Sequence, residues 1–409
     1  EMLRSLVGSE MCIRDSIITA RDYLAEAEWL AEALRARQGS DVNVTCRLET
    51  DDESRTTIAL GDLSTNPLIA RLYHAYLCWT DRRYPGPGGY EVRTIHNPFG
   101  DARNLVLLGC SDQAGARRAA ERFLTQTGQL SLPPLIDVEM TGPADAQFRA
   151  SAGNYYPYKA GLSDGLRYYL TGRIDLGQSY RRYLLSFDAD NIETTAAGIH
   201  MMWLFDMALW DLIEEQPLFS DADRLRITNF FLALARSEEG IGYIDVPEVM
   251  NNTGLRQSHH TNTAFAVWLA ARYFERDYAD LPGLREEIAG WRRVVAHTFA
   301  PGLRSSRGQC EAWHEWELEL DINFNYFTAA GKSDFVESGA LRAAAERIIL
   351  SCANTGIIAN SGDLFPWQQP PPCSLLGKAA FAYGDPRYRF FTHRKSLCLL
   401  YTSPSPRDS

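Results

Sequence analysis

The sequence predicts a mainly α-helical fold, in which an (α/α) toroid follows a small N-terminal α/β sandwich domain. Helix and strand patterns alternate over residues 17–130, whereas residues 148–396 repeat apolar side chains at helical spacing with almost no strand signals. Successive helices joined by short turns and rich in Trp and Tyr are typical of a toroid. In that architecture inner and outer helices alternate, and the substrate cleft lies at one end of the inner ring. Residues 131–147, which contain prolines, are predicted to link the two domains.

The N-terminal domain is predicted to run in the order helix, two strands, helix, two strands, helix. Residues 20–36 have the apolar spacing of a helix, and residues 42–49 (VNVTCRLE) alternate as a strand does. Pro67 stands where the first turn of a helix tolerates proline, and Ser111 or Asp112 is a suitable cap for the last helix. The other predicted elements are strands at 56–62, 90–95 and 104–109 and helices at 67–78 and 112–126.

Three segments of this domain carry a resemblance to a known domain. They read LGDLSTNPLIARL, GPGGYEVRT and NLVLLGCSDQAGARRAAERFL. Their pattern resembles the small α/β domain that precedes the barrel in β-hexosaminidases and α-glucuronidases, over about residues 17–130. The resemblance implies a structural accessory domain, so we place no catalytic residue in it.

The second domain is predicted to consist of helices. An α-solenoid is the alternative architecture, but it requires repeats of fixed period, and the sequence shows no such self-similarity. The predicted helices cover residues 160–171, 178–187, 198–215, 221–237, 259–275, 284–299, 310–328, 337–353 and 374–383.

The two ends of the chain resemble translated sequencing adapter. Residues 6–16 read LVGSEMCIRDS and residues 398–409 read CLLYTSPSPRDS, and codons for the two fall on opposite strands of one DNA stretch. We therefore expect residues 1–16 and 397–409 to be adapter-derived tails, which are set aside when the fold is predicted. The natural part would then be a metagenomic fragment beginning near Ile17, with a truncated toroid and a missing C-terminal domain.

Composition excludes some classes of function. The formal net charge of −11 disfavours a general nucleic-acid binder, although it permits a locally basic cleft for an acidic sugar. No apolar stretch reaches the roughly 18 residues that a membrane span needs. The eight cysteines show no CxxC or other zinc spacing. We expect neither a metal nor a cofactor.

The segment 251–274 (NNTGLRQSHHTNTAFAVWLAARYF) is the first candidate for chemistry. A polar, glycine-containing loop leads to Ser258, a suitable helix cap, and then to a long apolar helix. His259 and His260 would lie in its first turn, where the helix dipole favours a neutral imidazole. A neutral imidazole is what a general base needs. The alternative is that both rings only satisfy caps and loop carbonyls.

The segment 309–331 (QCEAWHEWELELDINFNYFTAAG) is the second candidate. Glu311 and His314 are three residues apart and would share one face of a helix. Trp313 and Trp316 are candidates either for the core or for platforms that stack on sugar rings.

A helical toroid with a His-His or Asn-His dipeptide opening an inner helix resembles the heparinase II/III and alginate lyase group of polysaccharide lyases. The resemblance covers about residues 150–365. It implies β-elimination on a uronic-acid polymer and hence export, so we expect a periplasmic or secreted protein. In this reaction a donor stabilises the carboxylate, a His or Tyr removes the neighbouring proton, and a Tyr or His protonates the leaving oxygen.

The resemblance assigns roles residue by residue. It implies that His260 is the base and that His259 holds the substrate carboxylate, at a position where the family has Asn. The family has a catalytic Tyr roughly fifty-five residues after the base, but the matching window here contains His314 and no Tyr. The further residues it implies are Asn252, Arg256 or Asn262 as carboxylate partners and His314 or Tyr326 as the acid. Trp313, Trp316, Glu311 and Asn262 are the candidate substrate-binding groups.

Two rival functions remain open. An inverting glycoside hydrolase needs two carboxyl groups, for which Asp206 and Asp211 could pair with Glu311, Glu315 or Asp321. Asp206 lies in a very apolar helix, where burial would raise its pKa as an acid catalyst requires, whereas Asp211 could simply pair with an arginine such as Arg224. A toroid that binds glycan without turnover is the third possibility, and in it the histidines and carboxylates would not converge.

Overall fold

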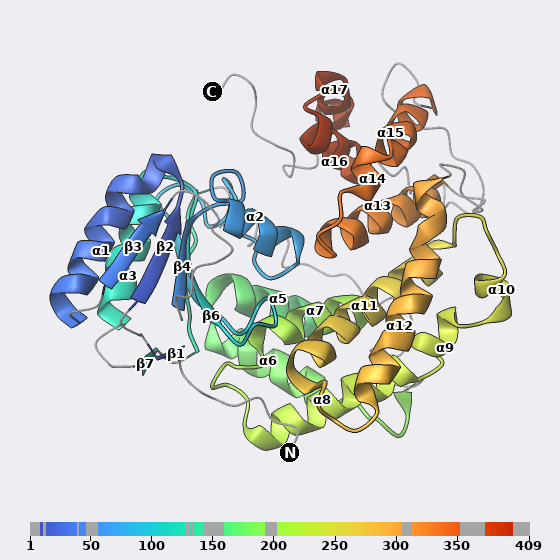
Figure 1. Ribbon diagram of the computed structural model, residues 1–409, viewed down its shortest axis with the longest axis horizontal. Helices are drawn as coiled ribbons and strands as arrows, with labels where there is room; N and C mark the ends of the chain where they lie inside the picture. The colour runs from blue at the N-terminus through green and yellow to red at the C-terminus, as the bar shows by residue number, and fades with distance from the viewer. Residues whose placement is uncertain are drawn as a thin grey trace. The chain divides into compact units, whose positions relative to one another are not determined.

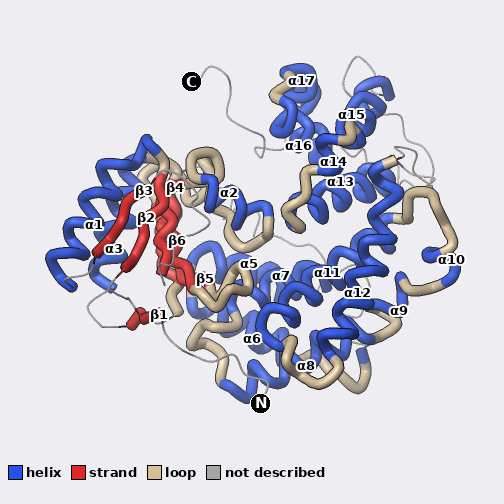
Figure 2. The backbone as a smooth tube through the Cα atoms, viewed as in Figure 1, coloured by secondary structure: helices blue, strands red, loops and turns tan. Residues whose placement is uncertain are grey.

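The computed structural model shows a mainly helical chain with one small mixed sheet (Figures 1 and 2). The structure describes residues 9–10, 14–38, 41–45, 56–126, 131–132, 134–142, 159–192, 203–304, 313–351 and 373–395. The chain divides into two compact units, each described here by itself. Unit 1 comprises Glu1–Ile199, Phe205–Leu234 and Arg272–Arg285, and unit 2 comprises His200–Leu204, Ala235–Ala271 and Glu286–Ser409.

The sheet of unit 1 has six strands in the order β3-β2-β4-β6-β5-β8. The first four of these are mutually parallel, and β5 runs antiparallel to both of its neighbours. In the register of the sheet, Ile17 lies opposite Val44 on one side and Ile58 on the other. The strands are β2 (Arg14–Thr19), β3 (Asp41–Thr45), β4 (Thr56–Gly61), β5 (Tyr90–Ile95), β6 (Asn104–Cys110) and β8 (Ile136–Glu139), and a separate antiparallel pair joins β1 (Ser9–Glu10) to β7 (Ser131–Leu132).

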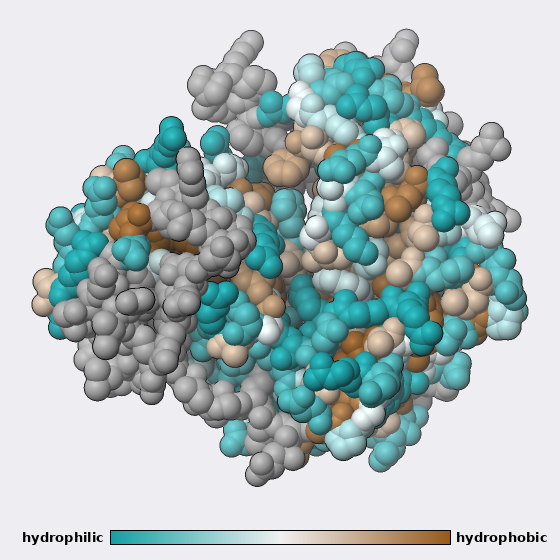
Figure 3. All heavy atoms as spheres, viewed as in Figure 1, coloured by the Kyte–Doolittle hydropathy of each residue, from teal (hydrophilic) through white to brown (hydrophobic). Residues whose placement is uncertain are grey.

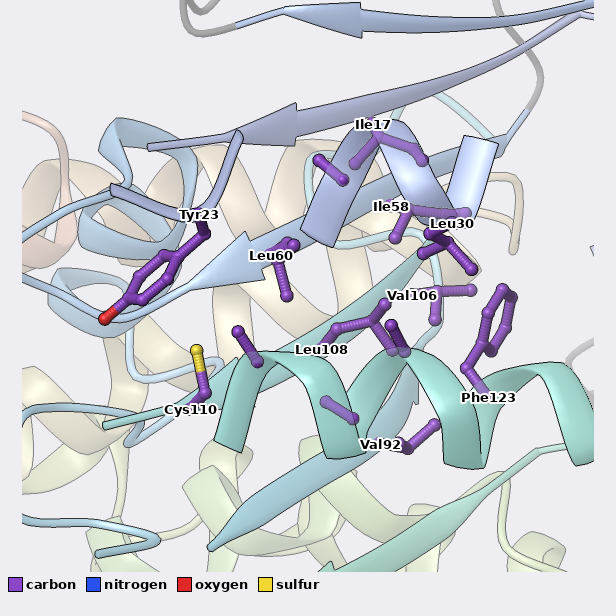
Figure 4. Packing of buried hydrophobic residues seen from close by; sticks show 14 of the residues in the cluster. Ile17, Tyr23, Leu30, Ile58, Leu60, Val92, Val106, Leu108, Cys110 and Phe123 are labelled. Carbon is purple, nitrogen blue, oxygen red and sulfur yellow. The ribbon is translucent and has the colours of Figure 1, made fainter. Parts of the chain in front are cut away.

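Helices cover both faces of this sheet. Consecutive strand residues point to opposite faces, so Ile17 packs in one apolar cluster and Ile18 in the other. Figure 4 shows the first cluster, in which Leu30 of α1 and Phe123 of α3 meet the strands. Helix α2 covers the second face. The three helices are α1 (Leu24–Gln38), which follows the short 3₁₀ helix Arg21–Tyr23, α2 (Pro67–His74) and α3 (Gln113–Gln126).

Four of the described strands were not predicted. The two-residue strands β1 and β7 lie in the predicted tail and in the predicted linker. Strand β2 begins at Arg14 and lies between β3 and β4. It was not predicted because residues 1–16 had been set aside as a tail, which left only Ile17–Thr19 as a strand signal. Strand β8 lies within the predicted linker and pairs with β5. The predicted tail 397–409 lies outside the described residues.

A buried arginine on β5 ties the sheet to helix α5 (Lys159–Thr171) of unit 1. Arg93 on β5 donates from Nε to Glu91 at 2.5 Å and from Nη2 to the carbonyl of Tyr169 at 2.6 Å. Its guanidinium also lies 3.6 Å from the centroid of the Tyr169 ring. Tyr169 belongs to α5, so this contact fixes α5 against the sheet.

Most of the longer helices coincide with segments of apolar periodicity. Helix α12 spans Leu284–Phe299, as predicted, because Leu284, Ile288, Trp291 and Val295 form one buried stripe. The short helices α9, α10 and α14 and the last helix, α17, were not predicted. The helices are α6 (Ile174–Leu185), α7 (Trp203–Ile213), α8 (Asp221–Arg236), α9 (Ile241–Ile244), α10 (Pro247–Met250), α11 (Ser258–Tyr278), α13 (Trp313–Ala329), α14 (Asp334–Glu337), α15 (Ala340–Ser351), α16 (Cys373–Tyr383) and α17 (Pro386–Lys395).

The described surface is mixed in character. On the face seen in Figure 3, hydrophilic side chains predominate and apolar residues form small separate groups. None of the helices in the described part of the chain combines the length and the apolar character needed to cross a membrane.

Candidate functional site

The candidate site of unit 2 lies where α11 begins. The helix starts at Ser258, whose buried carbonyl accepts hydrogen bonds from Thr261 Oγ1 at 3.0 Å and Asn262 Nδ2 at 2.8 Å. His259 and His260 therefore lie in the first turn, and both are partly exposed. The start of the helix is fixed by its own side chains.

His260 is in contact with an aromatic ring from another helix. The ring centroids of Tyr243 and His260 are 5.2 Å apart, and the ring planes are tilted by 33°. Tyr243 belongs to α9 and is partly exposed. Burial, followed by the nearby charge of Glu239, raises the pKa of the Tyr243 hydroxyl. The pair brings together a phenol that keeps its proton and an imidazole.

Arg256 closes the loop that precedes α11. Its side chain is 2 % exposed, and it donates from Nη1 to the carbonyl of Gly254 at 2.6 Å and from Nη2 to that of Asn252 at 2.5 Å. Nη2 also lies 3.2 Å from Nε2 of His297 on α12. Asn252 Oδ1 accepts from the Gly254 amide at 2.8 Å. Burial lowers the pKa of Arg256. The Arg256 guanidinium and the Oδ1 atom of Asn252 thus shape the loop.

Two other predicted site residues lie in well-packed surroundings. Asn262 is 8 % exposed and uses its amide donor on the helix. Tyr326 is 4 % exposed, stacks on Phe299 with centroids 4.1 Å apart, and meets the edge of Trp268. Burial raises the pKa of Tyr326.

The remaining predicted groups lie outside the described residues. Glu311 precedes the described part of α13. The backbone of α13 includes Trp313, His314 and Trp316, but their side chains, like that of Glu315, are not among those described. The predicted convergence of His260 and His314 stays a prediction.

Asp206, in unit 1, is a buried carboxyl group with two phenol partners. It is 2 % exposed and accepts hydrogen bonds from Tyr180 at 3.2 Å and Tyr183 at 3.1 Å. Burial raises its pKa to about 7, against the opposing effect of the two hydrogen bonds. The raised pKa that the apolar helix predicted is therefore found.

Asp211 and Asp321, the other predicted carboxylates whose side chains the structure describes, are paired with cations. Asp211 binds Arg272 at 3.1 Å and also Arg276. The predicted pairing of Asp211 with an arginine is therefore found, but the named example Arg224 was wrong. The Arg224 guanidinium binds the carbonyls of Glu214 and Gln216 and the carboxylate of Asp221. In unit 2, Asp321 forms an ion pair with Lys378 at 2.5 Å.

Tyr243 and His297 were not among the predicted site residues. Tyr243 stands 17 residues before His260 on a four-residue helix, and His297 lies near the end of α12. Neither position carries a sequence signal that links it to α11, because both contacts are made only by tertiary packing.

Within the described ranges, no cluster of three or more His, Cys, Asp or Glu side chains could hold a metal ion. Comparisons of the chain with protein-family models, with curated proteins and with solved structures found no match.

Proposed function

We propose that this chain is a polysaccharide lyase that cleaves a uronic-acid-containing glycan by β-elimination, on helices arranged as an (α/α) toroid. The contact between His260 and Tyr243 carries the proposal. A partly exposed imidazole in the first turn of a helix is favoured in its neutral, basic form. The raised pKa of Tyr243 means that its hydroxyl holds a proton at neutral pH. A base and an acid at one place are what the elimination requires.

The proposed roles follow from these positions. His260 removes the proton beside the uronate carboxylate, and Tyr243 protonates the leaving oxygen. His259 and Asn252 hold the carboxylate, which stabilises the negative charge that develops on it. His314 is the second candidate for the acid. Trp313, Trp316, Glu311 and Asn262 are proposed to contact an acidic polysaccharide or oligosaccharide, and Tyr326 to support the site from the aromatic core.

The test is a product assay with alginate, glucuronan and glycosaminoglycans. Lyase cleavage gives an unsaturated product that absorbs in the ultraviolet, with one new reducing end for each bond broken. We expect His260→Gln and Tyr243→Phe each to lower kcat by about 10²–10⁴-fold, because each removes one proton-transfer group. His74→Gln, on α2 of unit 1, is the matched control and should leave the rate unchanged. New reducing ends without the chromophore would rule out the lyase.

Asp206 supports a second candidate, an inverting hydrolase. A carboxyl group with a pKa of about 7 is suited to act as a general acid. Its burial and its two tyrosine partners equally suit a structural role. The hydrolase proposal predicts two results. The unsubstituted protein would release reducing ends without the chromophore, and Asp206→Asn would abolish that release. If the protein bound the polysaccharide but produced neither new reducing ends nor the chromophore, it would be a binding protein.

A further inference from the structure

The Arg256 side chain connects the loop before α11 to a second helix. Its Nη1 and Nη2 atoms donate to the carbonyls of Gly254 and Asn252, and Nη2 also faces Nε2 of His297. Arg256 as a whole is 2 % exposed. An interaction of a buried cation with two carbonyls is charge-assisted and stronger than a neutral hydrogen bond. Arg256 therefore connects the loop directly to α12.

This contact restricts the tautomer of His297. A guanidinium has five donors and no acceptor, so the 3.2 Å contact requires His297 to accept through Nε2. An imidazole that accepts at Nε2 is neutral and carries its proton on Nδ1. A protonated ring would instead direct an N–H group at another N–H group and place two positive charges side by side.

We propose that Arg256 and His297 are positioning residues for the site at the start of α11. The contacts of Arg256 with the carbonyls of Gly254 and Asn252 and with His297 form a clamp. This clamp fixes residues 252–254, in the loop that leads to the first turn of α11 with His259 and His260. Neither residue touches the substrate in this scheme. The effect of Arg256 and His297 on the rate of cleavage rests on the proposed lyase function. Their effect on the positions of the His259 and His260 rings does not depend on that function.

The experiment uses the full chain labelled with ¹⁵N in its histidines, observed by long-range ¹H–¹⁵N NMR at neutral pH. We expect His297 to show the Nδ1–H tautomer. Arg256→Gln should release this fixed tautomer and shift the resonances of His259 and His260. The matched control is Arg236→Gln, which removes an exposed ion pair between α8 and Glu287 on α12. That control should leave all three rings unchanged.

His297 provides a second pair of variants in case Arg256→Gln does not fold. His297→Gln keeps an oxygen that can accept from Arg256, whereas His297→Met does not. We expect His297→Met to lower kcat by up to about 10²-fold with little change in KM, since a displacement of about 1 Å has this effect. His297→Gln should restore most of the rate.

Two results would overturn the positioning role: a His297 ring that is protonated or carries its proton on Nε2, or unshifted His259 and His260 resonances in a folded Arg256 variant. Failure of the lyase proposal is a separate result. It would appear as missing product in the unsubstituted protein, while the NMR measurement would still decide whether the clamp exists.

Discussion

Asp206 shows how burial changes the chemistry of a single side chain. Removal from water raises its pKa from 3.8 to about 7. A carboxyl group whose pKa is higher in the fold than in the unfolded chain binds its proton more tightly in the fold. Its contribution to stability is therefore complete below about pH 3.8 and is lost as the pH rises to about 7. A shift of this size corresponds to on the order of 4 kcal/mol.

We predict that Asp206→Asn removes this pH dependence, because an amide does not ionise. Urea unfolding from pH 4 to pH 8 should show the unsubstituted protein losing stability relative to the variant between about pH 4 and 7. Asp280→Asn, at a fully exposed position, is the control and should leave the profile unchanged. If the free energy of unfolding changed with pH in the same way for the unsubstituted protein and for Asp206→Asn, the raised pKa would be contradicted.

The candidate site could be predicted only where local sequence determines it. Ser258 and the apolar residues after it place His259 and His260 at the start of a helix, and the structure has that helix. Tyr243 and His297 reach the site through packing between elements, so no spacing could have found them. The engagement of Arg256 with backbone carbonyls also depends on the folded loop.

At the scale of elements, amphipathic helices were the most predictable part of the fold. Helix α12 has a regular buried stripe, and its predicted bounds are those observed. Strands β2 and β8 were missed for separate reasons. Strand β2 was missed because its first three residues lie in the predicted tail, which leaves only Ile17–Thr19 as a strand signal. Strand β8 is an edge strand of four residues, too short for a clear alternating pattern.

Within unit 1, Asp211 of α7 is joined by buried charges to the last part of α11, which begins at Arg272. Asp211 is 3 % exposed and binds both Arg272 and Arg276. We predict that Asp211→Ala destabilises the protein by about 3–5 kcal/mol, because it leaves two guanidinium groups without their shared carboxylate. Thermal and urea unfolding would measure the loss.

The matched control for this prediction is Asp280→Ala. Asp280 pairs with Arg285 at 3.1 Å, but both side chains are largely exposed. An exposed pair contributes little to stability, so this variant should unfold like the unsubstituted protein. Equal effects of the two substitutions would show that the Asp211 pairs are as weak as surface pairs.

At the scale of the whole molecule, net charge opposes the proposed substrate. The chain carries a formal net charge of −11, and a polyuronate is also strongly negative. Repulsion between them acts over a Debye length of about 30 Å at 0.01 M salt but only about 8 Å at 0.15 M. Carboxylate-binding groups at the site act at contact distance, so salt weakens their attraction less than it weakens the general repulsion.

We therefore predict that the affinity for a polyuronate rises several-fold as salt increases from about 0.01 to 0.15 M, the range over which the repulsion is screened. The dissociation constant would be measured with His260→Gln, which should bind the polymer without cleaving it. The same polymer with its carboxyl groups reduced to alcohols is the control, and its affinity should not change with salt. An affinity that falls with salt would mean that positive side chains near the site dominate the encounter. The substrate would then be attracted by a local field that opposes the net charge of the molecule.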